Sequence, residues 1–269
     1  MPGLKGSFIC FFDEKTIFEK SMIVGGFLIR KDELPNLDKS VIQVKESLGL
    51  KETDPVKWDM GRCHKTLEKL GESKIPDLRK RMISLADELT IQIIMSHVWM
   101  GDPRNKLSAW RWSFENILQR ICIILDRKRE ELENLKNYPF MDIVFDWLPA
   151  RGPLRHYFDA YRDAYISGFK FQKNVLPPLR EFKVCPCLLA TSSFHSLALQ
   201  LTDFFIGATG DFFIWSYKGK KKQSVRDYFC KFFHKFRRDE NGNVVGSGLI
   251  VKSQSKKKVI SKLQELELI

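Results

Sequence analysis

The sequence predicts an α/β domain in which a mixed β-sheet is covered by helices on both faces. Two short apolar runs, residues 7–12 and 21–29, lie close enough in the chain to pair as an antiparallel hairpin. Further along, apolar runs alternate with segments whose apolar residues recur every three or four positions, as in strands linked by helices. A chain of 269 residues with 43% apolar residues can bury one good hydrophobic core.

The individual elements follow from periodicity and from the residues that break it. Residues 75–89 carry apolar side chains at helical spacing, and Pro76 suits the first turn of that helix. The β-branched residues of 89–99 predict a strand. Residues 182–189 predict another, in which Pro186 favours a sheet edge or a bulge. The remaining expected elements are a helix over 37–48, a long helix over 107–135, a strand over 140–145, a helix over 154–166 and a helix over 195–215.

The chain divides by composition into a main domain, residues 1–215, and a basic, aromatic C-terminal extension, residues 216–269, packed on the same domain. Within the extension, residues 225–236 place apolar side chains at helical spacing. They predict a helix that packs its aromatic face on the core and leaves its basic face in solvent. A turn at 239–242, a strand within 244–251 and a last helix within 252–269 complete the expectation.

The charge balance favours a polyanionic partner. Lys and Arg number 45 against 33 Asp and Glu, a formal net charge of +12. Such a surplus points to nucleic acid first and to an anionic membrane surface second, and the absence of a lipidation motif makes us expect no membrane partner. The competing interpretation is a basic surface that is merely solvated. The candidate nucleic-acid-binding residues are Lys218, Lys220, Lys221, Lys222, Arg226, Lys231 and Lys235.

The sequence also predicts a cytoplasmic protein. Its six cysteines are scattered, mostly in apolar runs, as expected of reduced core residues. The first residues do not form a signal peptide, because acids soon interrupt a short apolar stretch. No run reaches the roughly 18 to 20 apolar residues that a membrane span needs.

Three acids lie where carboxylates are rarely placed. Asp13 follows the first apolar run, and Asp146 follows the strand expected over 140–145. Asp203 lies inside the apolar helix expected over 195–215. Each alone could be a turn or cap residue. Together they can converge, and carboxylate oxygens are the ligands that Mg²⁺ and Mn²⁺ prefer. Two such ions about 4 Å apart activate a water and stabilise the leaving oxygen in phosphodiester cleavage.

These acids belong to a series of short motifs. They are FFDE at 11–14, IVGG at 23–26, VKW at 56–58, IVFD at 143–146 and, after Ser192, LQLTD at 199–203. In this series the chain resembles the DUF3800 family, uncharacterised prokaryotic proteins with a ribonuclease H-like fold. The resemblance covers roughly residues 7–215. Two departures are Lys15-Thr16, where the family has Ser-Gly, and Thr191, where it has an acid.

The resemblance implies a site that binds two Mg²⁺ or Mn²⁺ ions. Asp13, Asp146 and Asp203 would be the inner ligands. Glu14 or Glu115 would be the fourth acid of the site. Successive residues of a strand face opposite sides of the sheet, so Glu14 can join Asp13 only if the first strand ends at Asp13. Lys57 would neutralise the scissile phosphate or the transition state.

Three further residues lie in or near these motifs. Gln200, one helical turn before Asp203, is expected to orient that carboxylate. His156 and His195 are weaker candidates for a general base, because a metal-bound water needs none.

The expected function is a divalent-metal-dependent nuclease or a related phosphoryl-transfer enzyme acting on DNA or RNA. The alternatives are a nucleic-acid-binding protein that has kept the fold without catalysis, and a component of a defence or mobile-element system. The sequence carries no indication of an oligomeric state.

Overall fold

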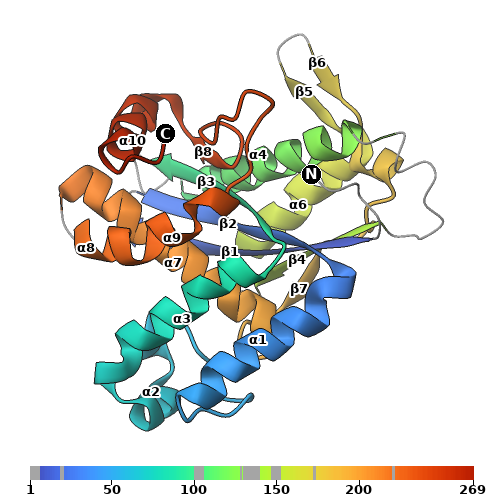
Figure 1. The fold of residues 1–269 in the computed structure, drawn as a ribbon. Helices are drawn as coiled ribbons and strands as arrows, with labels where there is room; N and C mark the ends of the chain where they lie inside the picture. Colours follow the sequence, from blue (N-terminus) through green and yellow to red (C-terminus); the bar gives the residue numbers. More distant parts are fainter. Residues whose placement is uncertain are drawn as a thin grey trace.

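A computed structural model describes residues 7–18, 21–99, 106–127, 129, 140–146, 153–171, 174–219 and 222–269. Its centre is a six-stranded mixed sheet with the strand order β7-β4-β1-β2-β3-β8, and helices cover both faces (Figure 1). The predicted α/β class, with a mixed sheet flanked by helices, is confirmed.

The sheet strands are β1 (Phe8–Phe18), β2 (Ser21–Arg30), β3 (Gln92–Trp99), β4 (Met141–Asp146), β7 (Leu189–Thr191) and β8 (Leu249–Val251). A separate hairpin pairs β5 (Phe169–Phe171) with β6 (Asn174–Leu176). The helices are α1 (Leu34–Ser47), α2 (His64–Leu70), α3 (Ile75–Glu88), α4 (Lys106–Asp126), α6 (Pro153–Ser167), α7 (Leu197–Lys218), α8 (Lys222–Ser224), α9 (Cys230–Phe232) and α10 (Ser253–Glu265).

In the six-stranded sheet, the pairing is antiparallel within the first three strands and parallel elsewhere. β1 pairs antiparallel with β2, and β2 pairs antiparallel with β3. β4 then lies parallel to β1, β7 parallel to β4, and β8 parallel to β3. Parallel neighbours present their carboxyl ends at the same edge of a sheet, and polar groups gathered there can share one site.

The two faces of the sheet carry separate hydrophobic cores, because successive residues of a strand point to opposite sides. In β1, Phe11 joins the core beneath α1, α3 and α7, and Phe12 joins the core beneath α4 and α6. Phe205 and Phe212 of α7 are completely buried in the first core.

Helix α7 is the longest helix on the first face. By length and composition alone it is the one helix among the described residues that could cross a membrane, although Asp203 and Asp211 interrupt its apolar residues. However, 83% of its most apolar window is buried inside the protein, as in a helix that forms the centre of a core.

Several predicted boundaries were wrong. β1 continues past Asp13 to Phe18, so the hairpin to β2 is much tighter than expected. The strand expected over 182–189 is divided: Val184 forms a single bridge to Met141, and β7 begins only at Leu189. Pro186 lies between them and has no N–H to donate, which explains the interruption. Helix α2 and the β5–β6 hairpin were not predicted. The long helix expected over 107–135 ends at Asp126, and most of the residues from 128 to 135 lie outside the described part of the chain.

The C-terminal segment shares both the core and the sheet. Phe229, Phe232, Phe233 and Phe236 are buried in the same core as α7. The expected helix is present as one uninterrupted helical segment over residues 222–235, whose type changes from α8 to a π-helical turn (Val225–Phe229), then to α9 and a short 3-10 turn (Phe233–Lys235). β8 then pairs with β3, so the segment predicted as an extension supplies one edge of the sheet.

Candidate active site

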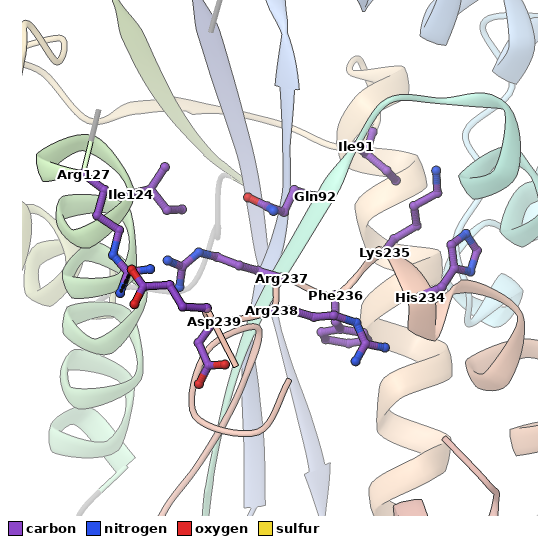
Figure 2. A pocket seen from close by; sticks show the side chains of 11 residues that line it. Ile91, Gln92, Ile124, Arg127, His234, Lys235, Phe236, Arg237, Arg238 and Asp239 are labelled. Carbon is purple, nitrogen blue, oxygen red and sulfur yellow. Dashed lines mark ion pairs between the residues drawn. The ribbon is translucent and has the colours of Figure 1, made fainter. Parts of the chain in front are cut away.

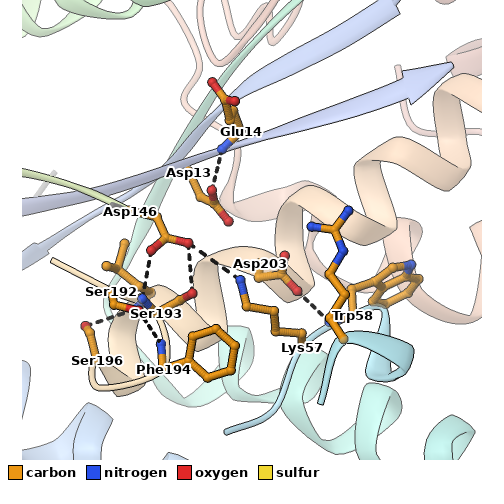
Figure 3. Close-up of polar contacts among 12 residues, drawn as sticks. Asp13, Glu14, Lys57, Trp58, Asp146, Ser192, Ser193, Phe194, Ser196 and Asp203 are labelled. Carbon is orange, nitrogen blue, oxygen red and sulfur yellow. Dashed lines mark hydrogen bonds and ion pairs between the residues drawn. The ribbon is translucent and has the colours of Figure 1, made fainter. Parts of the chain in front are cut away.

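Asp13 and Asp146 lie side by side because of the sheet register. The last paired residues of β1 and β4 are Phe12 and Phe145, and each acid follows directly. Both carboxylates are on the α7 face, and both residues are buried, at 4% and 5% exposure. Figure 3 shows Asp203 reaching the same place from α7. We call Asp13, Asp146 and Asp203 the acidic centre.

Asp203 is held by the loop before α2. The carboxylate oxygen Oδ2 of Asp203 accepts a hydrogen bond from the backbone N–H of Trp58. The Trp58 ring packs so closely on α7 that a Cβ at Gly207 would overlap it. Arg79 donates to the Trp58 carbonyl and lies 4.4 Å from the ring centroid. These contacts fix residue 57, the neighbour of Trp58, next to the acidic centre.

Lys57 forms an ion pair inside the centre. Its Nζ lies 3.6 Å from Oδ2 of Asp146, and the two side chains are 12% and 7% exposed. The same ammonium group lies 5.5 Å from the ring centroid of Phe194, which is 44% exposed. The structure therefore brings Lys57 together with the three acids.

Asp146 receives two further hydrogen bonds from one serine. Ser193 donates its backbone N–H to Oδ1 at 2.7 Å and its hydroxyl to Oδ2 at 2.8 Å. The sequence motifs point to the neighbouring Ser192, but its hydroxyl accepts the N–H of Phe194 within the turn. The signal that could have identified Ser193 is its place two residues after the end of β7, a strand parallel to β4.

The charges of the centre act on each other strongly. Burial raises the pKa of Asp13 well above its ordinary value, and the neighbouring carboxylates of Asp203 and Asp146 raise it further, whereas Lys57 opposes them. Lys15, two residues after Asp13 along β1, faces the same side and is half-buried. Burial lowers its pKa, and attraction to Asp203 acts in the opposite direction.

Glu14 and Glu115 do not join the centre. β1 continues beyond Asp13, so Glu14 points to the opposite face of the sheet, where its carboxylate accepts a hydrogen bond from the Tyr157 hydroxyl. Burial, and next the Glu14 charge, raise the pKa of Tyr157 well above its usual range. Glu115, on α4, accepts a hydrogen bond from Arg111 at 2.7 Å.

Gln200 has a different partner from the one expected. Its Oε1 accepts a hydrogen bond from the buried ammonium of Lys45 at 3.4 Å, and burial lowers the pKa of Lys45 to about 8. His195 lies exposed in the turn before α7, and His156 lies on α6 of the opposite face.

The predicted nucleic-acid-binding residues differ in their surroundings. Lys218, Arg226 and Lys231 are exposed. Lys235 donates to the backbone carbonyl of Leu89 at 3.1 Å, so it also serves the fold. Lys222 begins α8, and Lys220 and Lys221 lie outside the described residues.

The donor chemistry of the acidic centre fits a divalent cation, whereas its geometry is not that of a ready-made metal cage. Within the described part of the chain, Oδ2 of Asp13 and Oδ1 of Asp203 accept no hydrogen bond. These two hard oxygen donors remain available. No group of three or more His, Cys, Asp or Glu side chains is arranged to hold a metal ion among the residues that the structure describes.

Comparisons of the protein with family models, with curated proteins and with solved structures found no match. The resemblance to the DUF3800 family therefore rests on the motifs quoted above and stays a prediction.

Proposed function

We propose that the acidic centre belongs to a divalent-metal-dependent nuclease, or a related phosphoryl-transfer enzyme, acting on nucleic acid. One observation carries this proposal. Three carboxylates from β1, β4 and α7 meet on one face of the sheet, so closely that Asp203 and Asp146 both raise the pKa of Asp13. Buried like charges in contact are costly for a fold, and a cation between them would offset that cost.

The sheet supports the ribonuclease H-like part of the proposal. Strands β1, β2 and β3 form an antiparallel meander, and β4 and β7 continue the sheet in parallel on the β1 side. This is the arrangement expected of a ribonuclease H-like domain. The net charge of +12 agrees with a polyanionic substrate.

The residues around the centre suit a nucleic acid strand. Phe194 is an exposed aromatic ring beside Lys57, and aromatic rings are platforms on which bases stack. A pocket of about 430 Å³, lined in part by Phe194, His195 and Gln200, opens next to it. A base on Phe194 would bring its phosphate near the Lys57 ammonium.

The roles of the chain's own residues follow from their contacts. Asp13 and Asp203 would hold the cation through their available oxygens, and Ser193 keeps the Asp146 carboxylate oriented. Lys57 would balance the charge of the scissile phosphate. The bound Mg²⁺ or Mn²⁺ would supply water activation and stabilisation of the leaving oxygen.

A specific observation favours the alternative of a binding protein without catalysis. Lys57 pairs with Asp146 and the half-buried Lys15 is attracted to Asp203, so two lysines already offset part of the acidic charge. In this interpretation the lysines take the place of the metal, and the fold binds nucleic acid without cleaving it.

Asp146→Asn tests the proposal, because it removes one negative charge from the acidic centre while keeping the shape of the side chain. Wild type is expected to cleave labelled single- or double-stranded DNA or RNA with Mn²⁺ and to melt at a higher temperature with the metal. Asp146→Asn should abolish cleavage. The matched control is Asp142→Asn, in the same strand, whose carboxylate pairs with Lys31 at 2.7 Å and which should cleave normally.

Cleavage by Asp146→Asn at the wild-type rate would contradict the proposed mechanism. Nucleic acid binding without cleavage, together with a melting temperature that Mn²⁺ does not change, would establish the binding protein instead. A cytoplasmic location without a membrane partner remains part of the proposal, and cell fractionation tests it.

A further inference from the structure

A second charged site lies away from the acidic centre, where the start of β3 meets α4 and the C-terminal segment. Figure 2 shows this pocket, which has a volume of about 620 Å³. Its basic lining residues are Arg127, Lys235, Arg237 and Arg238, and His234 is beside them. We call it the arginine pocket. None of its lining residues belongs to the acidic centre.

Arg237 is the central feature of the pocket. The backbone N–H of Arg237 donates to the carbonyl of Ile93 at 3.0 Å, which fixes the residue at the sheet edge. Its guanidinium is buried, at 5% exposure for the residue, and donates to the Ser247 hydroxyl at 2.7 Å. No carboxylate of a described residue lies within ion-pair distance of it.

Other arginines surround this guanidinium. In Figure 2, Arg127, which follows α4, and Arg237 extend toward one another. Arg120 approaches from α4 and donates to the carbonyl of Gly246 at 2.7 Å. The pKa of Arg237 is lowered to about 10, first by burial and then by the charges of Arg127 and Arg120, which Asp239 only partly opposes. The group remains charged at neutral pH.

The acids that the structure describes near the pocket do not pair with the Arg237 guanidinium. Asp239 accepts hydrogen bonds from the backbone N–H groups of Asn241 and Asn243, which stabilise the turn. Glu240 pairs with Arg127 at 3.2 Å, but its side chain is 75% exposed, so the pair is screened by solvent. A buried guanidinium among like charges is costly unless an anion pairs with it.

We propose that the arginine pocket binds a phosphate group, through the guanidinium groups of Arg127 and Arg237. Guanidinium groups match the geometry of phosphate oxygens in paired hydrogen bonds, and the buried Arg237 is already fixed before the anion arrives. The volume suits a small ligand. The phosphate comes either from a free phosphate compound or from the end of a nucleic acid strand, and the site does not depend on the function proposed for the acidic centre.

The probe is inorganic phosphate, compared with chloride at matched ionic strength so that general screening cancels. Phosphate is expected to raise the melting temperature and to bind wild type by calorimetry. Arg127→Gln should weaken this binding by about tenfold, the effect of losing one charge-assisted hydrogen bond. Arg81→Gln is the matched control: its side chain is 46% exposed, close to the 45% of Arg127, and pairs with Asp77 far from the pocket.

Arg237→Gln should weaken binding more, and Arg127→Gln keeps the proposal testable if that buried variant does not fold. A 5′-mononucleotide and a short oligonucleotide with and without a 5′-phosphate then separate the two sources. Tighter binding of the mononucleotide supports a free compound, and preference for the phosphorylated oligonucleotide supports a strand end. No phosphate binding up to about 10 mM, or equal losses in Arg127→Gln and Arg81→Gln, would overturn the proposal. Phosphate binding that persists in Asp146→Asn keeps it separate from the acidic centre.

Discussion

The acidic centre and the arginine pocket are opposite solutions to the burial of like charges. In the acidic centre, Lys57 lies 3.6 Å from Asp146, and Ser193 donates two hydrogen bonds to the same carboxylate. In the arginine pocket, Arg237 has a serine hydroxyl and no ion-pair partner among the described residues. The first site carries part of its counter-charge within the chain, whereas the second leaves that charge to be supplied from outside.

This difference predicts opposite responses to the loss of a cation. Lys57→Met should destabilise the ligand-free protein by about 3 kcal/mol at pH 7, because it leaves buried carboxylates uncompensated. Arg127→Gln should leave the ligand-free protein as stable as wild type or more so, because it relieves repulsion. Urea unfolding measures both.

Lys31→Met is the control for Lys57→Met, since its more exposed pair with Asp142 should contribute less than about 1 kcal/mol. Equal losses of unfolding free energy in Lys57→Met and Arg127→Gln would contradict the difference inferred between the two sites.

The raised pKa of Asp13 predicts that the free energy of unfolding depends on pH through the acidic centre. A carboxyl whose folded pKa is raised contributes stability that is fully present below its ordinary pKa of 3.8 and is lost as pH rises through the folded value. With a chelator present, wild type should therefore lose stability relative to Asp13→Asn as pH rises from below 4 toward neutrality. Urea unfolding at several pH values tests this, and parallel curves for the two proteins would contradict it. Asp142→Asn is the control, because it keeps Asp13 and its stability should fall with rising pH as that of wild type does.

The smallest effect on stability is expected at the exposed basic surface. Replacing Arg226 and Lys231 together with Gln should change the free energy of unfolding by less than about 0.5 kcal/mol. The same double variant should reduce the slope of log affinity against log salt by about 0.7 for each lost contact with a single strand. Binding of labelled single-stranded DNA over a salt series gives this slope. An unchanged slope would show that these side chains are only solvated surface.

The sequence predicted the parts of the fold that depend on local periodicity. Residues 75–89 became α3 almost as expected, because apolar spacing alone specifies such a helix. The end of β1 was missed, because Asp13 reads as a strand end although pairing with β2 continues through Thr16. That error also concealed Lys15, which faces the acidic centre only if the strand continues.

The candidate site was predictable only as far as residue type and strand position allow. Asp13, Asp146 and Asp203 stood out as acids in apolar surroundings. By contrast, the link between Ser193 and Asp146, and the burial of Arg237 at the edge of β3, depend on contacts between segments far apart in the chain. Sequence periodicity contains no information about such contacts.

The position of β8 has a consequence for synthesis of the chain. The edge of β3 at Met95–His97 pairs with Leu249–Val251, which leave the ribosome long after β3 has formed. Until then β3 presents unpaired N–H and C=O groups along an apolar strand, the arrangement from which β-edge aggregation begins. Chains stopped before residue 249 are therefore expected to depend on chaperones. In the complete chain, pairing with β8 covers the edge of β3 and prevents it from pairing with the strands of other molecules.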